Sequence, residues 1–322
     1  GDPCMETGMI SSARSKTGRP KKSLVREIKA NKHIYLLILP AVLFYLIFHY
    51  VPMYGVTLAF KKFNFVKGIT GSKWVGLTNF KYIISEPEFW NAFKNTIIIS
   101  FGKLIWGFPM PIILAILFSE LRMNRYKKVA QTVFTFPNFL SWVIVAGFVR
   151  AIFADESGVY NALMTMLHLP QKSFLGNPKH FRSLLYLTGI WKGAGWGSII
   201  YLATISSVDP TLYEAAAIDG AGRIRNIIHI KWPAIKSTVV LLLLLNIGGV
   251  MSAGFDQIFN LYNPTVYSTG DIIDTYVYRL SFERAPRFEV SVAVDTFKSV
   301  INFMLLFSAD RFAKLIGERG IF

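Results

Sequence analysis

The chain has 322 residues, of which 52% are hydrophobic and only 17% are charged. A soluble protein of this length is rarely so apolar, and several apolar runs are long enough to cross a bilayer, so the composition indicates a polytopic membrane protein. The formal charge of +16 is no sign of nucleic-acid binding here, because the cations gather in the tails and short loops. The single Cys4 allows no internal disulfide.

The N-terminal residues 1–32 form a basic arm, in which many cations between residues 14 and 32 face the single acid Glu27. Such an excess predicts that the arm stays in the cytoplasm. The arm lacks the interleaved aromatic residues of a nucleic-acid-binding segment. Its first residues, 1–12, have the composition of a disordered tail. We expect no cleavable signal peptide, because the first apolar run is too long and follows this arm.

The remaining residues, 33–322, are expected to form one all-α membrane domain with six transmembrane helices. The predicted spans are residues 34–59, 96–118, 129–153, 183–206, 237–259 and 291–307. Cations in the segments 122–128, 223–236 and 311–319 place these loops and the C-terminus in the cytoplasm, on the same side as the N-terminus.

The segments expected on the outer side are 61–94 and 155–182. The first is rich in aromatic residues from 74 to 90, which favour the membrane interface. The second is polar and is expected to carry a short surface helix near residues 160–167. Prolines in the second span predict a kink there.

The fourth span contains Gly189, Gly193 and Gly197, which are four residues apart and share one helix face. This spacing predicts close helix packing, because small residues let backbones approach. A phosphate-binding loop is disfavoured, since no Lys-Ser or Lys-Thr follows these glycines.

The loop between the fourth and fifth spans, residues 209–235, is the most informative part of the chain. Asp209 can cap a helix that Pro210 begins, and residues 211–219 favour helix. Gly220 can end it, because glycine adopts positive φ without strain. A second short helix is expected over residues 223–231.

From Glu214 the sequence reads Glu-Ala-Ala-Ala-Ile-Asp-Gly-Ala, and after a short gap Ile-Lys-Trp-Pro ends at Pro233. This ordered pattern closely resembles the cytoplasmic coupling motif of ABC importer permeases, and it implies the type I permease fold. It departs at Trp232, where Leu usually precedes the proline. The resemblance implies that the coupling helix inserts into a separate ATPase subunit. The residues implied in that contact are Glu214, Ala215, Ala216, Asp219, Gly220 and Pro233.

Further blocks resemble permeases that import complex oligosaccharides with extracellular binding proteins. They lie at residues 76–80, 95–96, 254–264, 271–279 and 296–302, so that the resemblance covers most of the chain after residue 33. It implies a bacterial cytoplasmic (inner) membrane importer, with a second permease in a heterodimer, two ATPase subunits and an extracytoplasmic solute-binding protein. ATP and Mg²⁺ would be held by the ATPase, and no cofactor by this chain.

No catalytic or metal site is expected, so the chain is predicted not to be an enzyme. The five histidines are scattered, and the sequence shows no Ser-His-Asp pattern, zinc spacing or glycine-rich nucleotide loop. The histidines are His33, His49, His168, His180 and His229.

Polar and charged groups inside spans are costly in a bilayer and are therefore candidates for a substrate path. Trp rings can stack on sugar faces, and amides can bond hydroxyls. The cations would suit an acidic sugar, of which an alginate-type oligosaccharide is one candidate. Helix-end snorkelling or an internal ion pair is the alternative for each. The candidates are Lys103, Arg150, Trp191, Lys192, Trp196, Asn246, Asp256, Gln257, Asp295, Lys298 and Asn302.

The sequence therefore predicts one half of the membrane pore of an oligosaccharide importer that a separate ATPase drives. One alternative is an ABC permease for another small solute. A membrane glycosyltransferase would need acidic metal or sugar-nucleotide motifs in a cytoplasmic loop. A self-sufficient channel or secondary transporter would not need the helix that carries Glu214.

Overall fold

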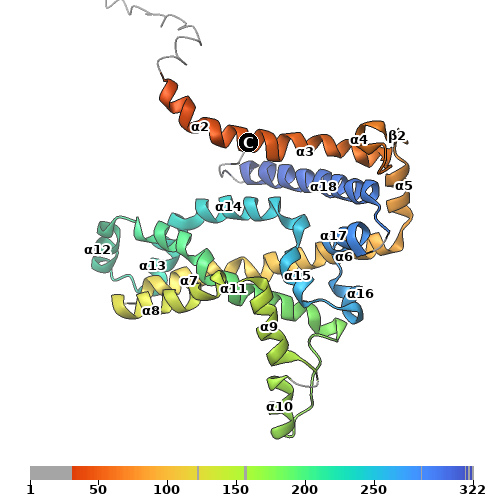
Figure 1. The fold of residues 1–322 in the computed structure, drawn as a ribbon. Coiled ribbons are helices and arrows are strands. Elements are labelled where there is room, and N and C mark those ends of the chain that lie inside the picture. The colour runs from red at the N-terminus through yellow and green to blue at the C-terminus, as the bar shows by residue number, and fades with distance from the viewer. Residues whose placement is uncertain are drawn as a thin grey trace, which may run out of the picture. The chain divides into compact units, whose positions relative to one another are not determined.

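The structure, a computed structural model, describes residues 31–121, 123–155, 158–283, 285–315, 317 and 320 (Figure 1). The basic arm up to residue 30 lies outside the described residues, as do Arg122 and Arg319, two of the predicted cytoplasmic cations. The chain divides into two compact units, residues 1–54 and 55–322, and each is described by itself.

The described part of the first unit is helical. It contains α2 (Lys32–Tyr45), the π-helical turn η1 (Leu46–Tyr50) and α3 (Val51–Met53). The helical segment Lys32–Phe60, to which these belong, is long and apolar enough to cross a membrane. This agrees with the predicted span 34–59.

The second unit is mainly helical, with one small antiparallel sheet in which Lys61 is opposite Trp74. Its first elements are η2 (Tyr54–Phe60), which starts in the first unit, β1 (Lys61–Lys62), α4 (Gly68–Gly71), β2 (Lys73–Trp74), α5 (Thr78–Ser85), α6 (Pro87–Gly102), η3 (Lys103–Gly107), α7 (Pro109–Glu120), α8 (Asn124–Thr135), η4 (Phe136–Phe139), α9 (Trp142–Phe153) and α10 (Val159–Met166). The later elements are α11 (Pro178–Ser206), α12 (Pro210–Ile218), α13 (Arg223–Asn226), η5 (Ile227–Lys231), α14 (Trp232–Gly248), η6 (Val250–Ser252), α15 (Phe255–Leu261), η7 (Pro264–Val266), α16 (Tyr267–Gly270), α17 (Ile273–Tyr278), η8 (Arg279–Glu283) and α18 (Phe288–Leu315).

Four π-helical turns interrupt the helices in the described part of the chain, and each ends shortly before a proline. They are η1 before Pro52, η3 before Pro109, η5 before Pro233 and η8 before Pro286. Proline donates no hydrogen bond, and its ring clashes with the carbonyl four residues earlier, so at the first three of these turns a wider turn lets the helix continue. In the second span, where the sequence predicts a kink, the structure has the π turn η3 within one helix from Pro87 to Glu120.

Four helices of the described chain are long and apolar enough to cross a membrane, or five if α8–η4 and α9 form one bent span. They are Lys32–Phe60, Pro87–Glu120, Arg223–Gly248 and Phe288–Leu315. α11 has 29 residues, but the glycines and Lys192 within it reduce its apolar character. The count of six spans therefore stays a prediction.

The predicted third span, 129–153, is wrong as a single straight helix. Residues Asn124–Phe139 and Trp142–Phe153 meet at an angle of 100°. Pro137 lies in the 3-10 turn η4, and Ser141 then caps α9 by accepting a hydrogen bond from the backbone N of Ile144 at 3.4 Å.

The predicted separate helix 223–231 and the fifth span 237–259 are also corrected. α13, η5 and α14 form one helix, Arg223–Gly248, because the π turn accommodates Pro233. The span then ends well before residue 259. Ala253 and Gly254 adopt the left-handed conformation, with φ of 48° and 82°, and α15 begins after them.

Three clusters of buried apolar residues hold the second unit together. One joins α9, α11 and α15, a second joins α6, α17 and α18, and a third joins α7, α11 and α14. α11 runs along α7, and Figure 1 shows α12 at one end of α11 and α16 at the other. The fold therefore separates the loop 209–235 from the predicted outer segments.

Candidate substrate cavity and coupling loop

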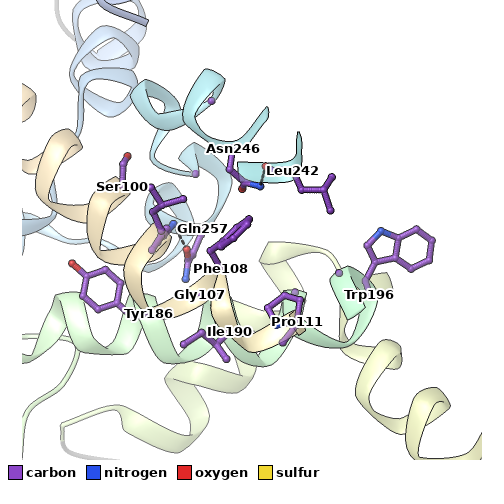
Figure 2. A pocket seen from close by; sticks show the side chains of 18 of the residues that line it. Ser100, Gly107, Phe108, Pro111, Tyr186, Ile190, Trp196, Leu242, Asn246 and Gln257 are labelled. Atoms are coloured by element: carbon purple, nitrogen blue, oxygen red, sulfur yellow. Dashed lines mark hydrogen bonds between the residues drawn. The ribbon is translucent and has the colours of Figure 1, made fainter. Parts of the chain in front are cut away.

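A cavity of about 890 Å³ lies among α6–η3–α7, α11 and the segment from α14 to α15 (Figure 2). Its wall combines aromatic rings with aliphatic side chains and a few polar groups, which is typical of small-molecule sites. Lining side chains include Ser100, Lys103, Phe108, Pro111, Trp142, Tyr186, Ile190, Trp196, Tyr201, Asn246 and Gln257.

The glycine face of α11 borders this cavity, and of its three glycines only Gly197 shows the close packing that the sequence predicts. A Cβ atom at Gly193 would meet nothing within 4 Å, and one at Gly189 would only touch the side chain of Gln257. At Gly197 it would lie 3.0 Å from Pro111. The tight approach is instead at Gly195, where a Cβ would stand 2.0 Å from the carbonyl oxygen of Phe134. Gly195 thus serves helix packing and Gly193 borders the cavity, whereas Gly197 does both.

Lys103 and Gln257 meet at the cavity wall. The Lys103 Nζ donates to the carbonyl oxygen of Ala253 at 2.7 Å and to the Gln257 Oε1 at 2.5 Å. The Gln257 Nε2 donates to the Leu185 carbonyl at 2.7 Å and to the Thr188 Oγ1 at 2.8 Å. Because both of its amide protons are engaged on α11, the Gln257 oxygen is held toward Lys103.

Trp196 and Asn246 are the other predicted path residues at the cavity. Trp196 is half exposed, and its ring meets the edge of Phe139 at a centroid distance of 5.8 Å. The Asn246 amide donates to the Leu242 carbonyl at 2.8 Å, one turn earlier in α14. In Figure 2, Tyr186 and Trp196 lie toward opposite ends of the cavity. The structure therefore brings together Lys103, Gln257, Trp196 and Asn246.

The predicted path residues Lys192 and Trp191 lie outside the cavity lining. The Lys192 Nζ donates to the Asn138 carbonyl at 2.7 Å and lies 5.6 Å from the centre of the Trp142 ring. It connects α11 to the bend after α8. Trp191 is half exposed on another face of α11.

The remaining candidates also lie away from the cavity lining. Asp256 and Asp295 are exposed, and Lys298 pairs with Asp274. The Asn302 amide donates to the Gly248 carbonyl, which links α18 to the end of α14. Arg150 donates to the Asn260 carbonyl at 2.5 Å. Lys298 thus forms an internal ion pair, which is one of the alternatives that the sequence left open.

Sequence reasoning missed a buried ion pair in the block 271–279. Asp271 and Arg279 form two hydrogen bonds of 2.6 Å each, and the guanidinium lies 4.8 Å from the centre of the Tyr267 ring. Both partners are nearly fully buried. The Asp and Arg are eight residues apart, so no helical spacing marks them as partners. Only the resemblance had drawn attention to this block.

The coupling helix α12 begins and ends as the sequence predicted. The Asp209 Oδ1 accepts a hydrogen bond from the backbone N of Thr211 at 2.9 Å, and the backbone and side-chain hydrogen bonds from Thr211 lower the pKa of Asp209. Gly220 has a φ of +70°, the left-handed conformation that ends the turn.

A buried lysine joins the coupling loop to the end of α7, and this link was not predicted. Lys231 donates to the Ser119 Oγ at 2.8 Å and forms an ion pair with Glu120. Tyr213 of α12 is half buried beside them; burial, and then the charge of Glu120, raise its pKa. Lys231 therefore links the loop directly to α7, which lines the cavity.

The predicted coupling residues divide between two faces of the loop. Ala215, Ala216, Asp219 and Pro233 line a hollow of about 460 Å³ between α12 and the start of α14. Glu214 is exposed, and Ile218 is 87% exposed although it is aliphatic. Both side chains are therefore accessible to another protein.

Long apolar helices around a cavity, with a short capped helix at one end, are the arrangement expected of a membrane transport subunit. Residues 107–317 match the family described as "Binding-protein-dependent transport system inner membrane component", and the chain belongs to this family. It is a transport permease with several membrane helices.

Two relatives from Bacillus subtilis (strain 168) match nearly the whole chain. One, the "Polygalacturonan/rhamnogalacturonan transport system permease protein YteP", is 42% identical over 302 residues, covering 94% of both chains. "Protein LplB" is 40% identical, covering 93% of this chain and 94% of its own. A chain from a bacterial alginate ABC transporter, in complex with an alginate pentasaccharide-bound periplasmic protein, has a TM-score of 0.85 at 36% identity. That match covers 93% of this chain and all of the other, and it identifies the type I ABC permease fold.

Proposed function

We propose that this chain forms one half of the membrane pore of an ABC importer for an oligosaccharide. The observation that carries the proposal is the coupling helix α12, which is capped at Asp209, turned at Gly220 and fastened to α7 through Lys231. The cavity offers aromatic rings and amides, as a sugar requires. Relatives that are named for polygalacturonan and alginate transport support the substrate class.

In this proposal α12 docks on a separate ATPase subunit through Glu214 and Ile218. Closure of the ATPase then displaces α12, and the contacts of Lys231 and Tyr213 transmit this movement to α7. The docked solute-binding protein and ATP favour different states of the pore, so each shifts the same equilibrium from its own side. The alanines Ala215 and Ala216 keep the loop compact against α14 and stay candidates for the ATPase contact.

The complete importer would contain a second, similar permease, two ATPase subunits with ATP and Mg²⁺, and an extracytoplasmic solute-binding protein. We place six spans in the inner membrane, with residues 122–128, at the start of α8, and the coupling loop in the cytoplasm. The cations of these two segments support that orientation, since positive charge is retained on the cytoplasmic side. Both termini would then be cytoplasmic.

The coupling role is tested with Glu214→Gln, Ala215→Leu and Gly220→Val, by measuring ATPase co-purification and oligosaccharide uptake together. We expect uptake to fall in each variant, either because the ATPase dissociates or because hydrolysis is uncoupled from transport. Lys128→Gln, which removes an exposed charge in α8, outside the loop, is the control. Normal co-purification and uptake in all three variants would show that the loop is only a connector.

The orientation is tested by labelling single cysteines from outside the cell in a Cys4→Ser background. Thr265→Cys, in η7, should be labelled, and Lys127→Cys, in α8, should be protected. The reverse pattern would exclude the proposed topology.

A further inference from the structure

Lys103 is the one charged residue that lines the cavity in the described part of the chain. Its ammonium group has three N–H donors. The structure uses two of them, on the Ala253 carbonyl and on the Gln257 Oε1, and both acceptors are neutral. Among the described residues, no carboxylate pairs with this ammonium. The cavity wall is therefore positively charged.

Three other buried or half-buried cations of the second unit are neutralised by carboxylates within the chain. Arg279 pairs with Asp271, Lys298 with Asp274, and Lys231 with Glu120. Lys61, Arg182 and Lys192 donate to neutral oxygens instead, but none of these three lines the cavity. A cation in a membrane-spanning segment is costly when it has no partner. A lysine that stays unpaired at a cavity wall, in spite of this cost, is suited to bind an anion that enters the cavity from outside.

The surroundings of Lys103 hold the ammonium in place before any ligand arrives. Gln257 is fixed by its own two donations to α11. Gly254 is left-handed, and a Cβ atom there would lie 2.7 Å from the Lys103 Nζ. Only glycine permits this approach at that φ. The left-handed turn before α15 thus points the Ala253 carbonyl toward Lys103. The absence of a side chain at Gly254 leaves room for the Lys103 ammonium group.

We propose that Lys103 binds the carboxylate of a uronic acid unit, and that the cavity accepts acidic oligosaccharides. This inference rests on the function proposed above and names its substrate class. The third N–H of Lys103 forms a charge-assisted hydrogen bond with the carboxylate, which is stronger than a bond between neutral groups. Tyr186 and Trp196 supply ring faces, and Asn246 supplies an amide for hydroxyl groups. A neutral sugar leaves the third donor to water.

The test uses the complete importer, with its partner permease, ATPase and solute-binding protein, in proteoliposomes. Uptake is compared for trisaccharides of galacturonate and mannuronate and for the neutral trisaccharides of galactose and mannose. We expect wild-type uptake of at least one uronate trisaccharide. Lys103→Gln should reduce that uptake about tenfold, as expected for loss of one hydrogen bond to a charged group. Lys103→Arg keeps the charge and should retain more uptake than Lys103→Gln.

The matched control is Lys192→Gln. Lys192 is also a span lysine bonded to a backbone carbonyl, but it lies outside the cavity lining. Its uronate uptake should stay within about twofold of wild type, because glutamine can still donate to the Asn138 carbonyl. Equal losses in Lys103→Gln and Lys192→Gln would overturn the assignment of a binding role to Lys103.

A second measurement avoids delivery by the solute-binding protein. Millimolar uronate trisaccharide should raise the thermal unfolding temperature of the purified complex, and Lys103→Gln should abolish the shift while Lys192→Gln preserves it. Uptake of neutral trisaccharides alone would overturn the inference and leave the proposed function standing. Failure to transport any saccharide would overturn both. Loss of the partner permease from Lys103→Gln would also overturn it, by showing that Lys103 pairs with a carboxylate of that subunit.

Discussion

The block 271–279 and the cavity wall each contain a buried cation, but the two cations have different partners. Both terminal nitrogens of the Arg279 guanidinium donate to Asp271, and the ring of Tyr267 lies against the face of the guanidinium. Lys103 has two neutral acceptors and no carboxylate among the described residues. The paired arginine holds helices together, whereas the lysine keeps a donor for use. In this fold the partners of a charge and its position at the cavity, rather than its burial, distinguish scaffold from site.

The largest effect is expected when the buried pair is broken. Arg279→Gln leaves the Asp271 carboxylate buried without its partner, which should destabilise the protein by about 3–5 kcal/mol. The thermal unfolding temperature of the purified complex measures this. The double variant Asp271→Asn/Arg279→Gln should be more stable than the single one, because no isolated charge remains. A wild-type unfolding temperature for Arg279→Gln would show that the pair does not hold the scaffold.

The two faces of α11 should respond differently to one methyl group. Gly195→Ala should cost about 1–3 kcal/mol, because its Cβ would overlap the Phe134 carbonyl and the helices must separate. Gly193→Ala, two residues earlier, faces the cavity and should be neutral or stabilise the helix by up to about 1 kcal/mol. Unfolding temperatures of the two variants give the comparison. Equal behaviour would contradict the placement of the cavity along α11.

Lys231→Gln separates the coupling loop from α7 without changing α12 itself. It leaves the partly exposed Glu120 without its cation, so the stability cost should be about 1–2 kcal/mol. The larger consequence should be functional, with ATP hydrolysis less dependent on substrate-loaded binding protein. The ratio of stimulated to basal ATPase activity measures this. An unchanged ratio would mean that this contact does not carry the coupling movement.

The smallest effect is expected at Lys192, although its residue type and setting resemble those of Lys103. Lys192→Gln should cost no more than about 1 kcal/mol, because one hydrogen bond to the Asn138 carbonyl can be rebuilt. A small change in unfolding temperature with retained uptake would support the contrast between the two lysines. A loss of uptake without a loss of stability would return Lys192 to the substrate path.

The sequence by itself determined the features that depend on neighbouring residues. Apolar runs marked the membrane segments, because the bilayer sets their length. The cap at Asp209 and the left-handed Gly220 followed from local backbone chemistry, and both are present. The ordered motif from Glu214 to Pro233 identified the family before any packing was known. In each case the physical cause acts within a few residues of the signal.

The tertiary structure alone decided which side chains meet. Gly193 and Gly195 are the same residue type two positions apart, yet one borders the cavity and the other touches α8, since successive positions turn about a helix. Lys103 and Lys192 are equally conspicuous in their spans, but only Lys103 has Gln257 and the left-handed turn beside it. The bend before α9 and the partner of Arg279 depend likewise on contacts across the fold. The periodicity of a sequence does not show which helix lies beside a given face or which residue of that helix makes the contact. These features therefore depend on the packing of the fold.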